Sequence, residues 1–465
     1  MQGTFVENDL ATVWTSPRRG EGSVVVVLHR GDAIDVLSRQ AGWVEVSLGR
    51  GRRGWINNLK TRSEGILEFA FIDVGQGDAC LMTTPKRWTV LIDGGENQMA
   101  ARYLAGRYGG GGADVVLDAI VVSHGDADHF AGLSTLILDA ATEKRLEKRI
   151  RVASRRVFHN GLVKRSSAVP EAERLGPPLL ANGRVLVPLV DDPRSVNDAN
   201  KPFTRWGAAL EELARRHRTE IRRLDSQTTN AFSFLDDVDV EVLGPRAEVG
   251  SDAKPYLPML GSEDGNGLSS ARTINGHSVV LKVTYGNVRT LLTGDINAAA
   301  ERELVKDHDA RQLSLKAELL KVPHHGSDDL SREFIRAVEP LVSVISAGDE
   351  DARRDYMHPR GNLLGLLGRA DRGAEPVVFV TNLSAFDRWV GRAFRAIEVA
   401  DAWIPDVARG TFYARERSTY GMVHVRTDGE RLLVVRRGAR KDRHEAYSFA
   451  IDAAGRAQAL PVDRV

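Results

Sequence analysis

Cysteine is nearly absent from this sequence, whose 465 residues contain only Cys80. A single cysteine excludes a disulfide-stapled scaffold and any zinc-finger or iron–sulfur site built from cysteine ligands. It also fits a reducing compartment. Cys80 lies beside a glycine-rich turn, and we interpret it as a small core residue. Any metal site must therefore be built from histidine and carboxylate side chains.

Long hydrophobic runs are also missing. The longest apolar stretches, such as Val24–Leu28, have the length of a strand. A membrane-spanning helix needs about 18 or more apolar residues in a row. The first residues lack the basic and apolar regions of a secretion signal. We therefore expect a cytoplasmic protein without a membrane segment.

Neither sign of charge is in excess, because 64 Lys and Arg residues face 63 Asp and Glu residues, a net charge of +1. This balance argues against a protein that coats nucleic acid with its whole surface. Local basic clusters remain at 149–156, 215–223 and 436–441. Each cluster has two interpretations: contacts to phosphate groups, or a solvated face that nearby acids balance. The second is the more common case.

The order of short patterns predicts three regions. Residues 1–64 carry short apolar runs between glycine-rich turns, which is typical of a small all-β unit. Residues 65–405 alternate strand-like and helical patterns, which indicates a layered α/β domain with a polar insertion at about 140–235. Short strands recur over residues 406–465 and predict a β-rich C-terminal extension.

Four potential metal ligands fall within six residues directly after the apolar run Ala119–Val122. They are His124, Asp126, Asp128 and His129. A loop can turn alternate side chains towards one point, while the adjacent histidine reaches a neighbouring point. So many carboxylates and imidazoles in one place are unfavourable unless cations neutralise them. The segment therefore predicts a site for two neighbouring cations.

This motif resembles the signature His-x-[His/Asp]-x-Asp-His of the metallo-β-lactamase superfamily, and its variant with Asp126 is similar to the ComEC-type branch of competence proteins. Further segments support the resemblance in the expected order: Phe71–Ala79, Leu91–Gly95, Asn275–Leu281, Leu291–Asp295, Lys321–Ser327 and Met357–Pro359. The resemblance implies a four-layer αββα sandwich. The N-terminal segment, with Gly42-Trp43 and Gly54-Trp55, resembles bacterial SH3 domains and implies an SH3-like barrel.

The resemblance also implies a role for each site residue. His124 and Asp126 would bind one divalent ion. Asp128 and His129 would bind the second, and Asp295 would bridge the pair. One histidine of the pair at 324 and 325 would complete a coordination shell, and the other would protonate a leaving group or hold a phosphate. The predicted metal ligands are His124, Asp126, Asp128, His129, Asp295, His324 and His358, with Asp128 and His325 as predicted catalytic residues.

Four further residues are candidates for binding a metal or for orienting its ligands: His277, Asn275, Asp93 and Asp73. His277 lies near the place where many superfamily members carry a ligand, but Asn275 stands where the branch has its usual residue, so both a ligand role and a structural role stay open. Asp73 and Asp93 are acids flanked by glycine-rich turns. They would either orient metal-bound histidines or stabilise the turns themselves.

Two ions about 3.5–4 Å apart can share a hydroxide, lower its pKa and stabilise an oxyanion. Asp126 in place of a histidine favours Mn²⁺, although Zn²⁺ is compatible too. We therefore predict a two-metal phosphodiesterase or nuclease that acts on DNA or RNA through a metal-bound hydroxide. The alternatives are a small-molecule hydrolase (of a lactone, cyclic nucleotide or phosphoester) and a non-catalytic binding module. The expected partners are nucleic acid as the substrate and a protein bound by the SH3-like unit.

Overall fold

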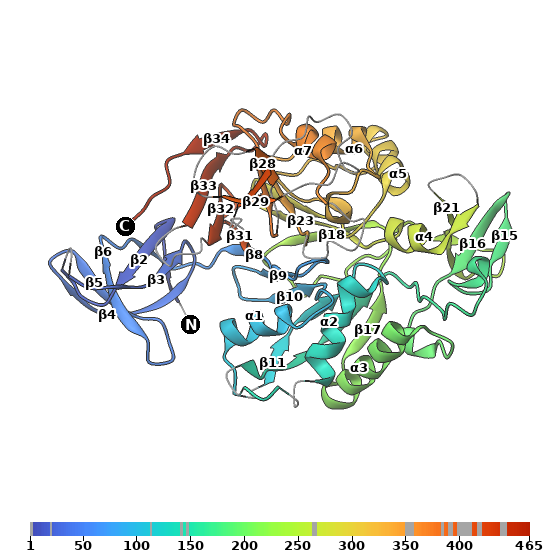
Figure 1. Cartoon of the computed structure of the whole chain (residues 1–465), viewed down its shortest axis with the longest axis horizontal. Helices are drawn as coiled ribbons and strands as arrows, with labels where there is room; N and C mark the ends of the chain where they lie inside the picture. The colour runs from blue at the N-terminus through green and yellow to red at the C-terminus, as the bar shows by residue number, and fades with distance from the viewer. Residues whose placement is uncertain are drawn as a thin grey trace.

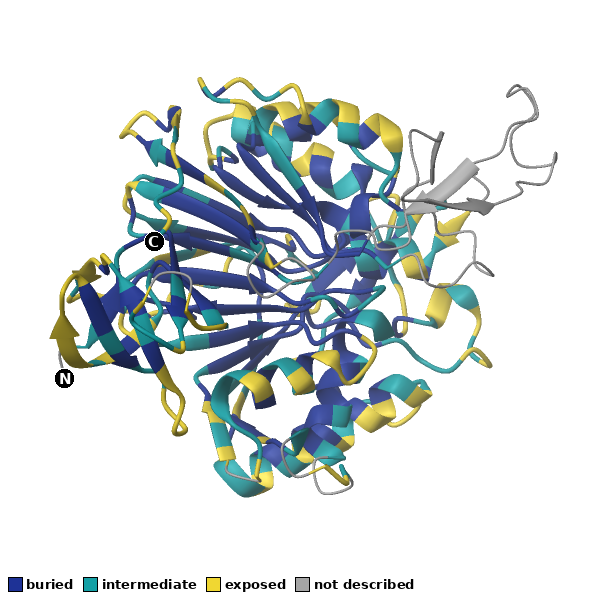
Figure 2. Cartoon of the chain, turned by 60° about the vertical axis from the view of Figure 1, so that its left-hand side comes forward, coloured by how far each residue is buried: buried dark blue, intermediate teal, exposed yellow. Residues whose placement is uncertain are grey.

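The computed structural model describes residues 3–18, 21–111, 114–139, 143–145, 148–262, 267–348, 358–382, 421–437 and 444–465. It also gives the backbone of three short strands, β28 (Phe386–Arg388), β29 (Phe394–Ile397) and β30 (Phe412–Arg415). Two large β-sheets stack face to face, and helices cover the outer face of each (Figure 1). Figure 2 shows that the stacked strands are mostly buried, whereas the helices are exposed on one side. The layers are therefore helix, sheet, sheet and helix, as the αββα prediction requires.

The first sheet has ten strands in the order β17-β14-β12-β10-β9-β8-β31-β32-β33-β34. β10, β12, β14 and β17 run parallel to one another, so their carboxyl ends meet at one edge. β31 pairs with β8, and the predicted C-terminal extension therefore continues this sheet. The bounds are β8 (Leu67–Phe71), β9 (Cys80–Thr83), β10 (Thr89–Ile92), β12 (Ala119–Val121), β14 (Arg156–His159), β17 (Glu220–Arg223), β31 (Val423–Thr427), β32 (Arg431–Arg437), β33 (His444–Ile451) and β34 (Ala457–Leu460).

The second sheet has six strands in the order β18-β23-β24-β25-β26-β27. The strands from β24 to β27 are parallel, so this sheet too has an edge of carboxyl ends. Apolar side chains of both sheets, such as Phe69 and Leu281, form the shared core between them. The bounds are β18 (Asp239–Gly244), β23 (Val280–Tyr285), β24 (Val288–Leu292), β25 (Leu319–Lys321), β26 (Val342–Ile345) and β27 (Val377–Val380).

Helices cover each sheet through their apolar faces. α1 (Met99–Tyr108), α2 (Ala127–Leu138) and α3 (Lys201–His217) pack on the first sheet. α5 (Ala298–Asp309), α6 (Arg332–Val338) and α7 (Gly361–Leu367) pack on the second. None of the helices in the described ranges has both the length and the apolar character needed to cross a membrane.

Only part of the predicted insertion at 140–235 is an insertion. β14, β17 and α3 belong to the first sheet and its helix layer, and β13 (Arg151–Ser154) pairs with β11 (Asp114–Leu117). The segments that stand apart form a side lobe of small strands and short helices at the right of Figure 1. The lobe comprises η2 (Glu171–Glu173), β15 (Leu179–Ala181), β16 (Arg184–Pro188), η3 (Pro193–Ser195), β19 (Glu248–Val249), β20 (Pro255–Pro258), β21 (Leu260–Gly261), β22 (Leu268–Ser269) and α4 (Ser270–Gly276).

The N-terminal unit is all-β, as predicted, with seven strands in the order β3-β2-β6-β5-β4-β1-β7. It lies beside the C-terminal strands of the first sheet (Figure 1), and Arg426 of β31 pairs with Asp32 at 2.8 Å. The predicted boundary at 405/406 lies outside the described residues. The bounds are β1 (Thr4–Val6), β2 (Leu10–Trp14), β3 (Val24–His29), β4 (Ala33–Gln40), β5 (Trp43–Ser47), β6 (Arg53–Asn57) and β7 (Thr61–Arg62).

Candidate metal centre

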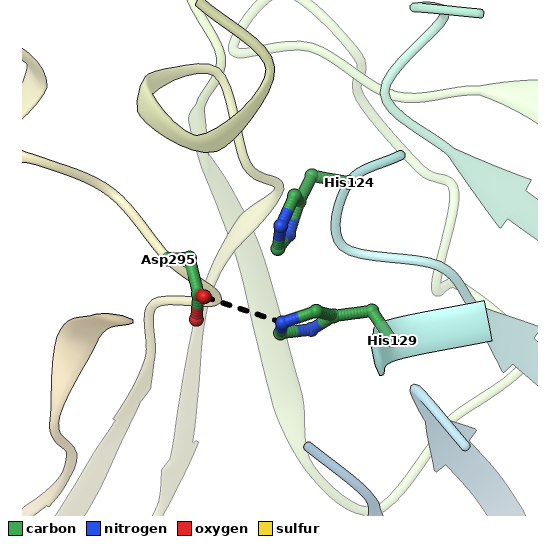
Figure 3. Close-up of side chains that lie close together, drawn as sticks. All are labelled: His124, His129 and Asp295. Atoms are coloured by element: carbon green, nitrogen blue, oxygen red, sulfur yellow. Dashed lines mark hydrogen bonds and ion pairs between the residues drawn. The ribbon is translucent and has the colours of Figure 1, made fainter. Parts of the chain in front are cut away.

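The candidate site lies where strands of both sheets end. His124 follows β12, and Asp128 and His129 lie in the first turn of α2. On the other sheet, Asp295 follows β24, and His325 lies in the short helix η4 (Pro323–Gly326) after β25. Figure 3 shows the imidazoles of His124 and His129 beside the carboxylate of Asp295. The site therefore forms only when the two sheets are stacked.

Glycine lets the loop before β9 approach the start of α2. Gly77 has a φ of +110°, and a Cβ at this position would overlap the carbonyl oxygen of Asp128. The backbone N–H of Asp78 donates to that same carbonyl at 3.3 Å. This close contact brings the buried side chain of Asp78 to the edge of the candidate site.

Asp93 fixes the orientation of His129. Nδ1 of His129 lies 2.9 Å from Oδ2 of Asp93, whose two oxygens also accept the N–H and Oγ–H of Ser123 at 2.7 and 2.6 Å. Nε2 of His129 therefore faces Oδ2 of Asp295, at 3.2 Å (Figure 3). Burial disfavours the imidazolium, but Asp295, Asp128 and Asp93 outweigh burial and raise the pKa of His129 well above its usual value.

The turn at η4 directs His325 into the site. His324, His325 and Gly326 have φ values of +47°, +53° and +84°, a left-handed run that is unfavourable for the two histidines. Nδ1 of His325 donates to the carbonyl of Ser346 at 2.9 Å, and Nε2 lies 2.9 Å from Oδ2 of Asp295. Burial opposes the charged ring, but Asp295 and the hydrogen bond that the ring donates to Asp128 raise the pKa of His325 to about 10.

The described residues contain four groups of three side chains that each offer ligand atoms within 4.8 Å of one another. Two ligands of one ion, each at about 2.1 Å from it, lie at most about 4.2 Å apart. Small side-chain adjustments would therefore bring the ligand atoms of each group close enough to bind one ion. The groups are His124–His129–Asp295, Asp128–His129–His325, Asp78–Asp93–His129 and Asp78–Asp295–His325.

The donor atoms of these groups fit a metal ion. Nε2 of His124 is buried and has no hydrogen-bond partner in the structure. Burial, followed by the neighbouring His129, lowers the pKa of His124 well below its usual value. The ring is therefore kept neutral, which is the form that binds metals.

Asp126 belongs to none of the four groups. Its Oδ1 lies 3.3 Å from Nζ of Lys164, and both side chains are partly exposed. Burial raises the pKa of Asp126, although Lys164 opposes the shift.

His324 and His358 also lie outside the four groups. Nε2 of His324 is 3.4 Å from Nδ2 of Asn275, and its ring centroid is 6.2 Å from that of His358. The carboxylate of Asp73 accepts the N–H of Gly75 at 3.2 Å, a contact that stabilises the turn. His324, His358 and Asp73 therefore belong to none of the four donor groups.

His277 is directed away from the donor groups. Its Nε2 donates to the carbonyl of Pro258 in the side lobe at 2.8 Å. Burial lowers the pKa of His277 to about 4. The neutral ring with a satisfied donor fits the structural interpretation of this residue.

Two residues of the site, Asp78 and Lys321, were not among the predicted site residues. Lys321 is 4% exposed; its Nζ contacts Asp78 and lies 3.3 Å from Oδ1 of Asp295. Both residues lie in segments that carry the resemblance. A lysine at the end of the apolar run Leu319–Lys321 was the available signal, because a lysine in a buried strand needs an acidic partner.

The basic clusters are largely balanced by acids. Each of the arginines below has a carboxylate within 3.4 Å, which favours the interpretation as a solvated, charge-paired face. Residues 438–441 of the third cluster lie outside the described part of the chain. The pairs are Arg151–Asp114, Arg155–Asp118, Arg215–Glu212, Arg223–Asp225 and Arg436–Glu445.

The chain is similar to several known proteins, of which three are described. ComE operon protein 3 of Bacillus subtilis is 27% identical over 324 residues, which are 66% of this chain and 31% of that protein. The uncharacterized protein YcaI of Escherichia coli is 38% identical over 100 residues, 21% of this chain and 12% of that protein. The solved structure of CmlA, a diiron β-hydroxylase from Streptomyces venezuelae, has a TM-score of 0.32 and 16% identity, with coverage of 68% of this chain and 53% of CmlA.

The chain thus spans less than a third of the length of the two curated relatives. Residues 72–222 match the family model of the metallo-beta-lactamase superfamily. The matched segment includes Asp93, His124 and His129 of the candidate centre. The family model therefore supports the placement of this chain in the metallo-beta-lactamase superfamily.

Proposed function

We propose that this chain is a metal-dependent hydrolase that holds two divalent ions and cleaves phosphodiester bonds, with DNA or RNA as the leading substrate class. One observation carries the proposal: the buried donors His124 and His129 from one sheet meet Asp295 from the other, with Asp128 and His325 beside them. The match of residues 72–222 to the family model of the metallo-beta-lactamase superfamily supports the same reaction class.

The donors divide into two sets. Because Nδ1 of His129 is bonded to Asp93, only Nε2 is available to an ion, and His129 would serve one ion only. His124, His129 and Asp295 would hold one ion, and Asp128 with His325 would contribute to the second. When bound, the ions supply positive charge that stabilises an oxyanion and lowers the pKa of water.

Other residues of the chain orient these donors and can handle protons. Asp93 fixes the ring of His129, and the carbonyl of Ser346 fixes that of His325. His324 is partly exposed and lies outside the donor groups, so its ring is available to give a proton to a leaving group. Lys164 brings a partly exposed positive charge to Asp126 at the border of the centre, where a phosphate oxygen would be attracted.

The preference for phosphodiesters rests on the resemblance to the competence branch, and the donors are compatible with it because two ions can stabilise both the attacking and the leaving oxygen. Carboxylates contribute many of the candidate ligands, and hard oxygen ligands suit Mn²⁺ as well as Zn²⁺. The assignment of a nucleic-acid substrate rests on the resemblance to the competence branch. The paired arginine clusters add no independent support for it.

The test is hydrolysis by the metal-free chain and by the chain loaded with Mn²⁺ or Zn²⁺. The substrates are single-stranded, double-stranded and circular DNA, RNA, and the chromogenic diester bis(4-nitrophenyl) phosphate. We expect cleavage that requires metal, is lost in His124→Ala and Asp295→Ala, and is retained in His277→Ala. No cleavage, or cleavage unchanged in Asp295→Ala, would reject the proposal. Cleavage of the chromogenic diester alone would favour the small-molecule alternative.

The N-terminal unit also has contacts that favour a structural role, besides the predicted binding of a protein partner. It packs on the C-terminal strands through apolar contacts of Leu10 and Val27 with Leu433 and Val435. These contacts favour a structural role in which the unit covers one end of the first sheet. We propose this covering role, and a protein partner would bind a surface of the unit that faces away from those strands.

A further inference from the structure

Lys321 is a buried cation inside an acidic site. It is the last residue of β25, and its exposure is 4%. Its Nζ contacts a carboxylate oxygen of Asp78, lies 3.3 Å from Oδ1 of Asp295 and donates to the carbonyl of Gly294 at 2.8 Å. Burying an ammonium group is costly unless acidic groups pair with it. Its presence at this place therefore calls for an explanation.

The ammonium group of Lys321 stands at a position where donors for a divalent ion converge. Asp78, Asp295 and His325 form one of the four donor groups, and Asp78 also belongs to a second. Lys321 contacts the acid that these two groups share. The two groups without Asp78 both contain His129, and one of them shares Asp295 with Lys321.

The two oxygens of Asp295 have different partners. Oδ1 faces Nζ of Lys321 at 3.3 Å. Oδ2 lies 3.2 Å from Nε2 of His129 and 2.9 Å from Nε2 of His325. One oxygen is therefore held by the lysine, and the other is directed towards the histidines.

We propose that Lys321 is a built-in monovalent cation that fills the position between Asp78 and Asp295 and keeps a divalent ion out of it. Only Oδ2 of Asp295 is then left for ions on the side of His124 and His129. The inference deepens the proposed function and rests on it for the ions at the other two donor groups. One ammonium offsets one of the two carboxylates, so the site keeps a negative charge that attracts divalent ions.

Three variants separate the effect of the charge of Lys321 on ion binding from the effect of its volume. Lys321→Ala removes the ammonium and opens space for an ion, whereas Lys321→Met removes the charge and keeps most of the volume. Lys282→Ala is the matched control, because Lys282 is 6% exposed on β23 of the same sheet and donates to the carbonyl of Ser314 at 2.8 Å. The measurements are the number of Mn²⁺ ions bound per chain after equilibrium dialysis, and the rise in Tm that Mn²⁺ causes.

We expect Lys321→Ala to bind one more Mn²⁺ per chain than the wild type, and Lys321→Met and Lys282→Ala to bind the wild-type number. The rise in Tm with Mn²⁺ should be larger in both Lys321 variants than in the wild type and in Lys282→Ala. The reason is that the carboxylates left without the ammonium increase the affinity of the folded chain for divalent ions.

The inference is overturned if Lys321→Ala binds the wild-type number of ions and if Mn²⁺ raises the Tm of both Lys321 variants only as much as that of the wild type. If Lys321→Ala does not fold, the test is the rise in Tm of Lys321→Met with Mn²⁺: a larger rise than in the wild type supports the inference, and an equal rise overturns it. A wild-type chain that binds no Mn²⁺ would refute the proposed function instead. In that case the inference about Lys321 stands if Lys321→Ala binds one ion and fails if it binds none.

Discussion

At the scale of single residues, the candidate centre depends on the groups that hold its donors in place. Asp93 accepts the Nδ1–H of His129 at 2.9 Å, which leaves Nε2 for an ion. An asparagine at this position offers a weaker acceptor, so we expect Asp93→Asn to weaken Mn²⁺ binding about 10–100-fold. Titration of the metal-free protein measures this.

Asp118→Asn is the control for that experiment. Asp118 accepts the N–H of Thr89 at 2.9 Å, at the opposite end of β10 from Asp93. Its replacement should weaken a hydrogen bond similar to the one that Asp93 accepts, without changing the affinity for Mn²⁺. Equal affinity losses in both variants would show that Asp93 acts on the fold rather than on His129.

A comparison of His124 with His277 provides a second test. We expect His124→Ala to lower the metal-dependent hydrolysis rate by about two orders of magnitude, the size of effect seen when one charge-stabilising group is removed. His277→Ala should keep the rate, because its Nε2 donates to Pro258 rather than to the donor groups. Rates with the chromogenic diester test both variants, and equal losses would contradict the assignment.

Local sequence predicts a ligand well when neighbours in the chain are also neighbours in space. His124, Asp128 and His129 share one loop and one helix turn, and their spacing alone indicates a metal site. Asp78 and Lys321 come from different sheets, and each acquires its role only from the other. The lysine at the end of the buried run Leu319–Lys321 indicates that an acid lies nearby, but a pairing across two stacked sheets leaves no local pattern that identifies Asp78 as that acid.

At the scale of secondary-structure elements, we expect the end of β14 to respond to pH. Nδ1 of the buried His159 accepts the N–H of Gly161 at 3.0 Å, and its Nε2 donates to the carbonyl of Asp191 at 3.0 Å. The ring must be neutral for both bonds. Burial lowers the pKa of His159 to about 4.

The sign of the pH dependence follows from this pKa. Between about pH 6.5 and pH 4 the unfolded chain binds a proton at His159 and the folded chain does not, so the free energy of unfolding falls as the pH falls. From pH 7.5 to pH 5, His159→Gln should lose about 2 kcal/mol less stability than the wild type. Urea unfolding at the two pH values measures the difference, and equal losses would contradict a neutral His159.

Helix and strand patterns predict elements with different success. The start of α3 follows from local sequence, because the side chain of Asn200 accepts the N–H of Phe203 and Pro202 fits the first turn. β14 and β17 lie within the segment interpreted as an insertion. Arginines occupy both strands, and their apolar content is too low to distinguish them from a polar loop.

At the scale of the whole molecule, a buried ion cluster joins the N-terminal unit to the sandwich. Arg426 is 4% exposed and pairs with Asp32 at 2.8 Å and Glu68 at 3.0 Å. Removing one member of a buried ion cluster costs about 3–5 kcal/mol. We therefore expect Arg426→Ala to lower the free energy of unfolding by that amount and to separate the unfolding of the two units.

Arg437→Ala is the reference variant, because Arg437 is exposed at the end of β32. Its effect should stay within about 0.5 kcal/mol. Calorimetry of the two variants and the wild type measures this. A single transition at the wild-type temperature in Arg426→Ala would refute the joining role of the cluster.

The sequence predicts the structural class of each region better than it predicts which strands pair with one another. The all-β character of the first residues and the α/β alternation after them follow from hydrophobic periodicity. The pairing of β31 with β8 could not be predicted, because the strand β31 carries no local signal for its partner. As a result, residues that seemed a separate extension complete the first sheet.

The most direct test of the candidate centre is the number of Mn²⁺ or Zn²⁺ ions bound per chain after equilibrium dialysis, for the wild type and for the double variant His124→Ala, Asp295→Ala. These two residues come from different sheets and share a donor group. We predict two ions in the wild type and at least one fewer in the double variant. No bound ion in the wild type, or the same number in both proteins, would contradict a two-metal centre at this site.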